Sequence, residues 1–267
     1  MQMSLVNSIL KSLSTFYINA IAIKKRLIFK SIYFYPVMLE QLKQELQKLA
    51  DKEKAKILQS FFKTGKGEYG EEDVFLGIDV PMQRKIAKKY PVLSLFKIQD
   101  LLKSKIHEHR FIALLILIDK YKKTNKKEDI FGFYLKNIKY INNWDLVDLS
   151  APNIIGDFLF EKDKKVLYEL ANSKNLWEKR IAIISTFNFI KKGEFQDALA
   201  VSEILINDSH DLIHKAVGWM LREIGKRDSG ILENFLNFHY KKMPRTMLRY
   251  AVEKFPEEKR KKYLKKK

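Results

Sequence analysis

The sequence contains no cysteine, little glycine or proline, and no long apolar run. Without cysteine, disulfides and zinc sites with thiolate ligands are excluded. Ten glycines and six prolines in 267 residues favour long helices over turn-rich β architectures. The longest uncharged apolar run is Phe111–Ile118, well short of the roughly 20 residues that a membrane-spanning helix needs. We therefore expect a soluble all-α protein with no membrane partner.

Basic residues outnumber acidic ones over the whole chain. Lysine and arginine total 51 against 32 acidic residues, which gives a net charge of +19. Residues 1–37 hold five basic residues and no acidic one, so residues 38–267 still carry +14. A positive field of this size attracts polyanions, of which nucleic acid is the commonest. A lysine-rich composition with solvated surfaces would give the same totals, so both interpretations stay open at this point.

The ends of the chain differ from its middle. Residues 1–37 are rich in Ser, Ile, Phe and Tyr, and their basic cluster Lys24–Arg26 follows the apolar stretch instead of preceding it, unlike a secretory signal. We expect an accessory extension of unknown role, or translation from Met38, where an amphipathic helix begins; a basic transit peptide is the rival interpretation. Residues 38–254 are predicted to form one domain, and residues 255–267 a basic tail.

A short pattern recurs along the chain from residue 110 onward. Its copies are Arg110–Ala113, Trp144–Val147, Lys179–Ala182, Ile213–Ala216 and Leu248–Ala251, and their last members are 34, 35, 34 and 35 residues apart. Each copy ends in a small or short apolar residue, against which a neighbouring helix can pack closely. Each interval has room for two helices, and stacked units of this kind form a solenoid with a concave side. Chance spacing of common alanines is the alternative interpretation.

Two other segments suggest ligand sites less strongly. The stretch Lys63–Gly70 places three glycines among lysines, but its spacing fits neither a Walker motif nor a dinucleotide fingerprint, so we expect a plain loop. His107, Glu108 and His109 could suggest a metal. Adjacent positions on a helix point apart and no third ligand is suitably spaced, so we expect no metal site.

Tryptophan, aspartate and arginine recur at corresponding places in three of the copies. Trp144 and Asp148 are four residues apart and share one helical face, and Trp177 and Arg180 lie one turn apart. The fourth copy combines Trp219 with nearby basic residues. A solenoid would align these side chains along one groove. Taken singly, each has a structural explanation, since a helical tryptophan is usually core and an aspartate near a helix start is usually a cap.

The chain resembles a known family in five segments that occur in family order. It is similar to the DNA alkylation repair family of HEAT-like-repeat DNA glycosylases (AlkD-like), from about Met38 to Tyr250. The segments that carry this resemblance are Phe75-Leu-Gly-Ile-Asp-Val-Pro81, Trp144-Asp-Leu-Val-Asp148, Ile155-Gly-Asp157, Leu176-Trp-Glu-Lys-Arg180 and Lys215-Ala-Val-Gly-Trp-Met-Leu-Arg-Glu223.

The resemblance implies an all-α HEAT-like repeat solenoid whose concave groove binds double-stranded DNA. It implies a monofunctional glycosylase, without metal or cofactor, that removes cationic N3- or N7-alkylated purines without drawing the base into a deep pocket. We further expect a monomer, located in the cytoplasm and associated with the nucleoid through its DNA.

The resemblance also assigns roles to individual residues. Asp148 would stabilise positive charge on the deoxyribose and orient the attacking water. Trp144 and Trp219 would offer aromatic faces to the cationic sugar or base. Arg180 matches an arginine that holds a backbone phosphate. The remaining DNA contacts that we expect are Lys215, Arg222, Arg84, and either Phe61 or Phe62, where the family has an aromatic contact.

Two other functional classes compete with the glycosylase. A non-catalytic HEAT-like protein that recognises bent or branched DNA by charge and shape would share the fold and the groove. A protein-interaction module would share the fold alone, its charge serving solubility. Asp148 between two matched tryptophans favours the enzyme, and salt-sensitive DNA binding would argue against the interaction module.

Overall fold

The computed structural model describes residues 35–265, and their regular structure is helical apart from one isolated bridge between Val74 and Ile106. The helices are α2 (Tyr35–Lys48), α3 (Lys52–Phe61), α4 (Val80–Ala87), α5 (Leu95–Leu102), α6 (His107–Lys123), α7 (Lys127–Lys136), η2 (Ile138–Tyr140), α8 (Trp144–Ala151), η3 (Pro152–Gly156), α9 (Asp157–Leu159), α10 (Lys165–Ala171), α11 (Leu176–Lys191), α12 (Gln196–Ile204), α13 (Asp211–Gly225), α14 (Ser229–His239), α15 (Arg245–Ala251) and α16 (Glu257–Leu264). The prediction of an all-α fold is confirmed.

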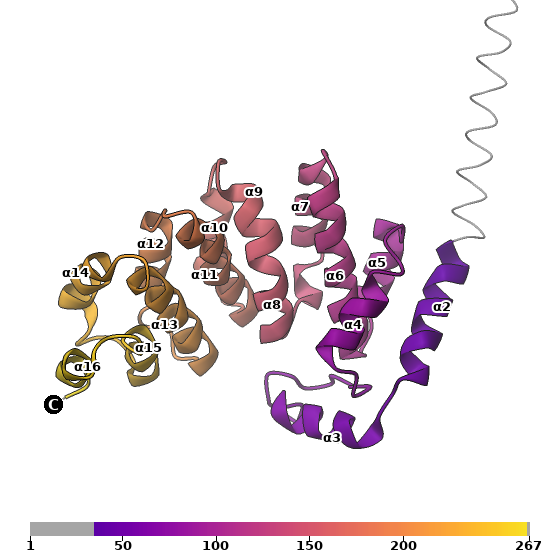
Figure 1. Cartoon of the computed structure of the whole chain (residues 1–267), viewed down its shortest axis with the longest axis horizontal. Helices are drawn as coiled ribbons and strands as arrows, with labels where there is room; N and C mark the ends of the chain where they lie inside the picture. The colour runs from indigo at the N-terminus through magenta and orange to yellow at the C-terminus, as the bar shows by residue number, and fades with distance from the viewer. Residues whose placement is uncertain (1–34, 266–267) are drawn as a thin grey trace, which may run out of the picture.

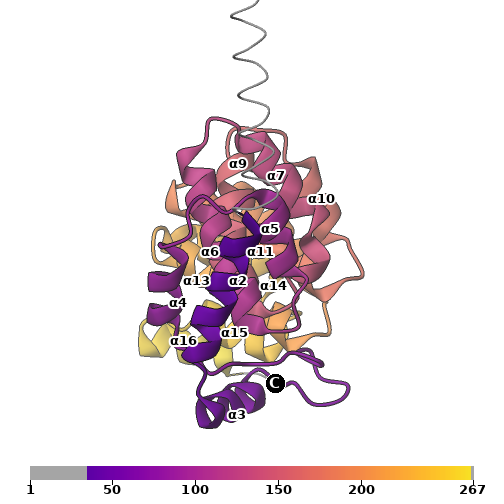
Figure 2. The same cartoon turned by 90° about the vertical axis from the view of Figure 1, so that its right-hand side faces the viewer.

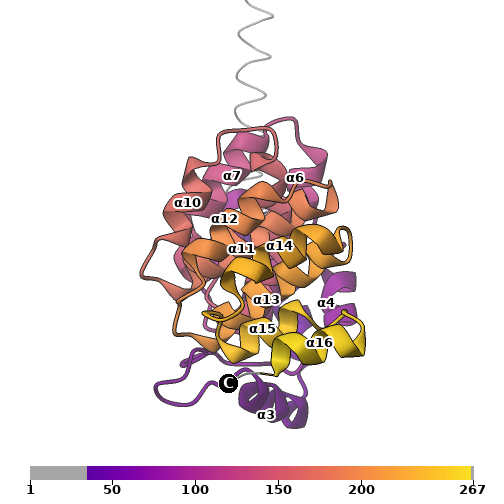
Figure 3. The ribbon, with the colours of Figure 1, turned by 90° about the vertical axis from the view of Figure 1, so that its left-hand side faces the viewer.

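The helices form an arch in chain order (Figure 1). One row consists of α4, α6, α8, α11, α13 and α15, each packed on the next, and helices such as α7, α10, α12 and α14 form a second row. Figure 2 views the N-terminal end of the arch and Figure 3 its C-terminal end; in both views α3 and the loop after it lie below the stacked helices.

The recurring residues mark the contacts between successive helices of the first row. Ala113 in α6, Val147 in α8, Ala182 in α11, Ala216 in α13 and Ala251 in α15 are all at most 1% exposed. Small side chains at these positions let the backbones approach, and each helix covers the apolar face of its neighbour. The predicted helical repeat is therefore confirmed.

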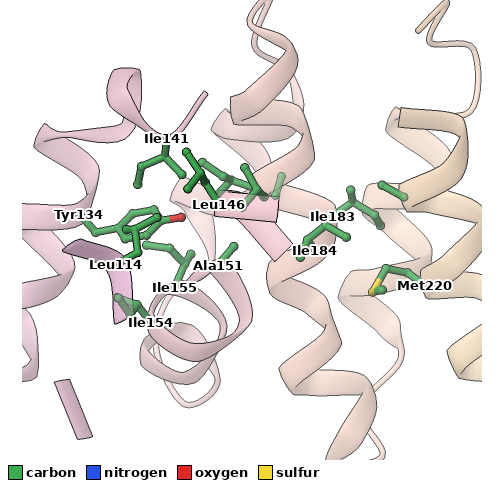
Figure 4. Packing of buried hydrophobic residues seen from close by; sticks show 14 of the residues in the cluster. Leu114, Tyr134, Ile141, Leu146, Ala151, Ile154, Ile155, Ile183, Ile184 and Met220 are labelled. Carbon is green, nitrogen blue, oxygen red and sulfur yellow. The ribbon is translucent and has the colours of Figure 1, made fainter. Parts of the chain in front are cut away.

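One apolar core runs through the arch. Figure 4 shows part of it, where Leu114, Tyr134 and Leu146 lie beside Ile154 and Ile155, and Ile183, Ile184 and Met220 continue the packing toward the C-terminus. The Tyr134 hydroxyl shares a hydrogen bond of 2.9 Å with the Ser150 hydroxyl. Each fully buried large side chain contributes about 1.5–3 kcal/mol relative to exposure. Because the core is continuous, the helices of the first row are held in fixed relative positions.

Helix α8 continues directly into a π-helical turn, η3. Gly156 at its end lies so close to α11 that a Cβ atom there would stand 2.2 Å from the Ser185 carbonyl oxygen. Glycine is therefore required for α11 to pack against this turn. Irregular turns of this kind are frequent next to functional sites, and this one fixes α8 against α11.

The first predicted boundary of the repeat domain falls inside a helix, and the second falls between α15 and α16. The described part of α2 begins at Tyr35, so the predicted boundary after residue 37 falls inside a helix; residues 1–34 of the predicted extension lie outside the described residues. The predicted basic tail contains helix α16, whose Tyr263 is buried against Tyr240 and Phe255. Among the described residues, none of the helices combines the length and apolarity that crossing a membrane requires.

Candidate active site

Seven of the eight predicted site residues line one cleft of about 520 Å³. The cleft lies among α3, the loop that follows it, α8, α11, α13 and α15. Its lining residues are Phe61, Lys63, Tyr69, Trp144, Asp148, Arg180, His210, Asp211, Leu212, Lys215, Trp219, Arg222 and Tyr250. Arg84 is the exception, because it is exposed on α4 and borders a different hollow together with Lys88 and Lys122.

Helix α8 presents Trp144 and Asp148 to the cleft from one face. The helix begins at Trp144 because the side chain of Asn143 accepts a hydrogen bond of 2.8 Å from the Trp144 backbone N–H. Asp148 follows one turn later, where residues four apart meet on the helix surface. Leu146 and Val147 between them point into the core, so the helix cannot rotate and both side chains keep their direction.

Asp148 forms a two-pronged ion pair with Arg180 of α11. The Arg180 Nε donates to one carboxylate oxygen at 3.0 Å, and a terminal nitrogen donates to the other at 2.8 Å. Burial raises the pKa of Asp148 above its ordinary value, although the Arg180 guanidinium pulls it down; the Asp145 carboxylate adds to the rise. The side chain of Asp148 stays 19% exposed, so its carboxylate can meet a substrate.

Arg180 lines the cleft and is hydrogen-bonded within the protein. Its side chain is only 6% exposed, and its third hydrogen bond goes to the Leu212 carbonyl oxygen at 2.6 Å. A guanidinium turned toward Asp148 and the first turn of α13 holds the carboxylate in place. The Nε and both terminal nitrogens of Arg180 each donate one hydrogen bond within the protein, and the phosphate contact of Arg180 stays a prediction.

Trp219 approaches the cleft from α13. Its indole N–H donates to the Glu223 carboxylate at 3.3 Å, and its ring lies 5.7 Å from that of Phe187. The preceding Gly218 packs against α15, where a Cβ atom would stand 2.5 Å from the Met247 carbonyl oxygen. The family-like segment 215–223 thus combines a close helix contact with a half-buried tryptophan that faces the cleft.

The two predicted cations of α13 also line the cleft, but both are paired. Lys215 lies 2.7 Å from the Asp211 carboxylate one turn earlier and remains substantially exposed. Arg222 pairs with Glu253 beyond α15, and its buried Nε has no hydrogen-bond partner. Exposed pairs of this kind hold together weakly, so a phosphate could replace either carboxylate.

Phe61 and Phe62, at the N-terminal wall of the cleft, differ in exposure. Phe61 is 62% exposed and stands edge-on to Trp144 with ring centroids 6.0 Å apart. Phe62 is buried and stacks flat on Trp144 at 5.1 Å and on Phe75 at 5.0 Å. Phe61 is therefore the exposed ring of the two, and the buried Phe62 packs against Trp144.

The segment from Phe75 to Pro81 holds this wall in place. The buried Glu108 carboxylate accepts hydrogen bonds from the backbone N–H groups of Leu76, Gly77 and Ile78. Gly77 has a φ of +84°, and a Cβ atom there would stand 2.2 Å from the Asp51 carbonyl oxygen. Glycine is required at this position, because helix α3 starts directly against it and carries Phe61 at its far end.

A buried charged cluster ties the loop after α3 to α6 and α8. His107 lies between two carboxylates, with Nδ1 3.2 Å from Asp73 and Nε2 2.8 Å from Asp145. Asp73 also receives hydrogen bonds from Arg110 at 2.6 Å and Asn143 at 3.3 Å. Burial opposes a charge on His107, but the Asp145 and Asp73 carboxylates prevail and raise its pKa to about 9. The protonated imidazole of His107 therefore links Asp73 of the loop to Asp145 of α8.

Sequence reasoning missed several residues of this arrangement. Tyr69 and Lys63 reach the cleft from the loop, and Tyr250 stands next to the recurring Ala251 of the fifth copy, a position at which the repeat register could have revealed it. His107 was considered only as a metal ligand. In the part of the chain that the structure describes, no group of three or more His, Cys, Asp or Glu side chains is placed to hold a metal ion.

The glycine-rich stretch Lys63–Gly70 forms a plain loop, as expected from its spacing. The backbone N–H groups of Gly65 and Gly67 donate to the carboxylates of Glu68 and Glu71, both at 2.9 Å. These amides are used within the loop, whereas a phosphate loop would turn them toward an anion. The cleft as a whole can offer aromatic faces, the carboxylates of Asp148 and Asp211, and cations whose carboxylate partners a phosphate could replace.

The chain is similar to one protein family and to solved structures. The family model for the DNA alkylation repair enzyme matches residues 42–255. A solved structure described as a predicted DNA alkylation repair enzyme from Enterococcus faecalis is similar, with a TM-score of 0.62 and 16% identity over 78% of this chain and 97% of that one. The crystal structure of smu.31 from Streptococcus mutans UA159 matches with a TM-score of 0.44 and 17% identity over 86% and 98% of the chains.

No curated protein sequence matched the chain in a similar comparison. The likeness to the Enterococcus faecalis protein concerns the fold, since so few residues are identical. The family model carries the assignment, because it spans most of the chain and includes the helices that line the cleft. The chain belongs to the DNA alkylation repair enzyme family.

Proposed function

We propose that the protein is a DNA glycosylase that releases cationic N3- or N7-alkylated purines from double-stranded DNA by hydrolysing the N-glycosidic bond. The observation that supports this proposal most directly is Asp148, a partly exposed carboxylate in a cleft that Trp144 and Trp219 also line. Family membership supplies the coarser statement that the protein takes part in the repair of alkylated DNA.

The chemistry requires little from the protein. An alkylated purine already carries positive charge, so it departs as a neutral base with the bonding electron pair and needs no general acid. Positive charge then develops on the deoxyribose, and a nearby carboxylate stabilises it. Water adds to the anomeric carbon, supplies the new hydroxyl group and releases its remaining proton to solvent. Asp148 would stabilise the sugar cation and orient this water.

Arg180 would keep the carboxylate fit for this task. Each carboxylate oxygen has a lone pair left after its bond to the guanidinium, so it can also accept a hydrogen bond from water. Arg180 opposes the effect of burial on the pKa of Asp148 and favours the ionised form. In this role Arg180 is a positioning residue, whereas Lys215, Arg222 and Phe61 would contact DNA.

The second candidate is a binding protein without catalytic activity. A carboxylate bonded on both oxygens by one arginine is also what a purely structural ion pair looks like, and such a protein would recognise DNA by charge and shape. Both candidates predict salt-sensitive DNA binding, but only the first predicts free base in solution.

The experiment that separates them is base release. Purified protein is incubated with methylated duplex DNA, and the released bases are separated by chromatography. We expect N3- and N7-methylpurines from the wild type and a loss of about 100-fold or more in Asp148→Asn. Asp197→Asn is the matched control, because Asp197 lies outside the cleft with a side chain of similar exposure, 21%. Strong DNA binding without base release would establish the second candidate instead.

A further inference from the structure

The loop that follows α3 crosses to the middle of the arch and places a tyrosine in the cleft. Tyr69 lines the cleft from this loop, and its ring stands edge-on to Trp177 of α11 with centroids 6.0 Å apart. The loop therefore runs from α3 to α11, the helix that carries the third copy of the repeat. Tyr69 is half-buried but is not one of the side chains packed into the apolar core.

The loop is held firmly at both ends. At its start, the Gly70 N–H donates to the Lys63 carbonyl oxygen at 3.0 Å, and Lys63 adopts a φ of +52°. At its end, Asp73 is anchored by Arg110 and His107, and Val74 pairs with the backbone on either side of Ile106. None of these anchors involves the Tyr69 side chain. These anchors therefore do not fix the identity of the side chain at position 69, whose ring lies in the cleft and against Trp177.

The surroundings of Tyr69 are those of an aromatic face offered to a ligand. Phe61, Trp144, Trp219 and Tyr250 line the same cleft from α3, α8, α13 and α15, so together with Tyr69 the rings come from five separate elements. Burial raises the pKa of the Tyr69 hydroxyl, which stays protonated at neutral pH and leaves the ring uncharged. Aromatic faces attract cations, and the attraction grows when water is excluded.

We propose that Tyr69 is a specificity-determining residue whose ring favours a cationic alkylated base over a neutral one. This inference rests on the proposed function, because it concerns the same cleft and the same class of DNA. It adds the Tyr69 ring to the two tryptophans proposed for catalysis and gives the loop a role in the site. The ring, and not the hydroxyl, carries the preference.

The test compares Tyr69→Phe, which keeps the ring, with Tyr69→Leu, which keeps apolar bulk without a π face. Both are made in the Asp148→Asn background, so that the adduct stays in the DNA during the measurement and preference from that carboxylate's charge is removed. The dissociation constant is measured at fixed salt for a duplex with one N7-methylguanine and for the same duplex with guanine. The preference is the ratio of the two constants.

We expect Tyr69→Phe to keep the preference and Tyr69→Leu to lower it about fivefold, with affinity for the unmodified duplex unchanged. Tyr168→Leu, a half-buried tyrosine on α10 outside the cleft, should change neither constant. Melting temperatures confirm that each protein is folded, and Tyr69→Met replaces the leucine variant if that one unfolds.

Three results would overturn the inference: the leucine variant keeps the preference, the phenylalanine variant loses it equally, or the background shows none. Base release by protein with Asp148 intact is measured separately. Release without a ring-dependent preference would reject only the inference about Tyr69. A ring-dependent preference without release would reject only the glycosylase.

Discussion

The half-buried Asp148 and the buried Asp73 are both bonded to an arginine, yet their pKa values move in opposite directions. Burial raises the pKa of both carboxyls. At Asp73, hydrogen bonds and charges from His107 and Arg110 outweigh burial and lower the pKa below its ordinary value. At Asp148, Arg180 alone does not outweigh burial, and the pKa remains raised.

The comparison shows how one fold holds two aspartates in different electrostatic surroundings. Asp73 contacts His107 directly, whereas Asp148, the proposed catalytic residue, follows the other partner of His107, Asp145, by three residues in α8. Asp73 is 5% exposed and contacts His107, Arg110 and Asn143 through one carboxylate oxygen, so it anchors the loop. Asp148 has one cationic partner and an open side toward the cleft. A carboxylate whose charge is incompletely matched is the one that gains most from a developing cation.

The largest predicted difference between the two aspartates is in the free energy of unfolding that each one contributes. Asp73→Asn removes the charge opposite Arg110 and His107 inside the protein, so we expect the free energy of unfolding to fall by about 3–5 kcal/mol. Asp148→Asn should cost less, about 1–3 kcal/mol, because its site is partly exposed and the amide oxygen still accepts one Arg180 bond. Urea denaturation measures both.

Base release should rank these two variants the other way. The folded fraction of Asp73→Asn should keep much of the wild-type rate, whereas Asp148→Asn should not. If Asp148→Asn proved the more destabilising of the two, the carboxylate in the cleft would be structural, and the contrast with Asp73 would fail.

A second prediction concerns pH and sharpens the structural half of the comparison. The folded-state pKa of His107 is about 9, above its ordinary 6.5, so protonation stabilises the folded protein. That contribution is fully present below pH 6.5 and is lost as the pH rises through 9. Between pH 6 and pH 9.5, the free energy of unfolding should fall by about 3 kcal/mol more in the wild type than in His107→Gln.

Chemical denaturation at several pH values gives this difference directly. Parallel pH dependences in the two proteins would mean that His107 is uncharged in the fold. In that case no cation would lie between Asp73 and Asp145, and a protonated His107 would not link the two carboxylates.

The smallest effect concerns DNA binding by the cations of the cleft. Lys215→Gln should weaken binding at all sequences and reduce the magnitude of the log–log salt slope by about 0.9, the value for one phosphate contact. Arg180→Gln should leave the slope unchanged, because the guanidinium is buried against Asp148. Lys165→Gln is the control, since Lys165 also forms a pair four residues along its helix but lies on α10.

A reduced slope for Arg180→Gln together with an unchanged slope for Lys215→Gln would reverse these roles. Arg180 would then leave Asp148 to bind a phosphate when DNA arrives, as the family resemblance implies.

Much of this architecture was predictable from sequence, and the failures have physical causes. The recurring alanines and Val147 predicted the repeat because close packing of helices restricts those positions to small side chains. The spacing of Trp144 and Asp148 predicted a shared face because both lie on one helix. The pairing of Asp148 with Arg180 joins two copies of the repeat, and no local pattern specifies which donor turns inward.

The loop was the least predictable part of the site. Gly65, Gly67 and Gly70 announce an irregular segment, but where it ends depends on Asp73 meeting Arg110 and Asn143 far along the chain. Tyr69 was therefore invisible as a site residue until its loop was placed. The same long-range anchoring hid His107, which is one of four consecutive polar residues at the start of an otherwise largely apolar helix.

The pH dependence of base release tests most directly whether Asp148 is the carboxylate that stabilises the sugar cation. The single-turnover rate constant is measured on methylated duplex DNA and corrected for base loss in the absence of protein. The rate should be constant near neutral pH and fall about tenfold per pH unit below an apparent pKa that lies above the ordinary 3.8 of aspartate, because only the carboxylate is active. A corrected rate that stays level down to pH 4, or that rises on acidification, would contradict the assignment.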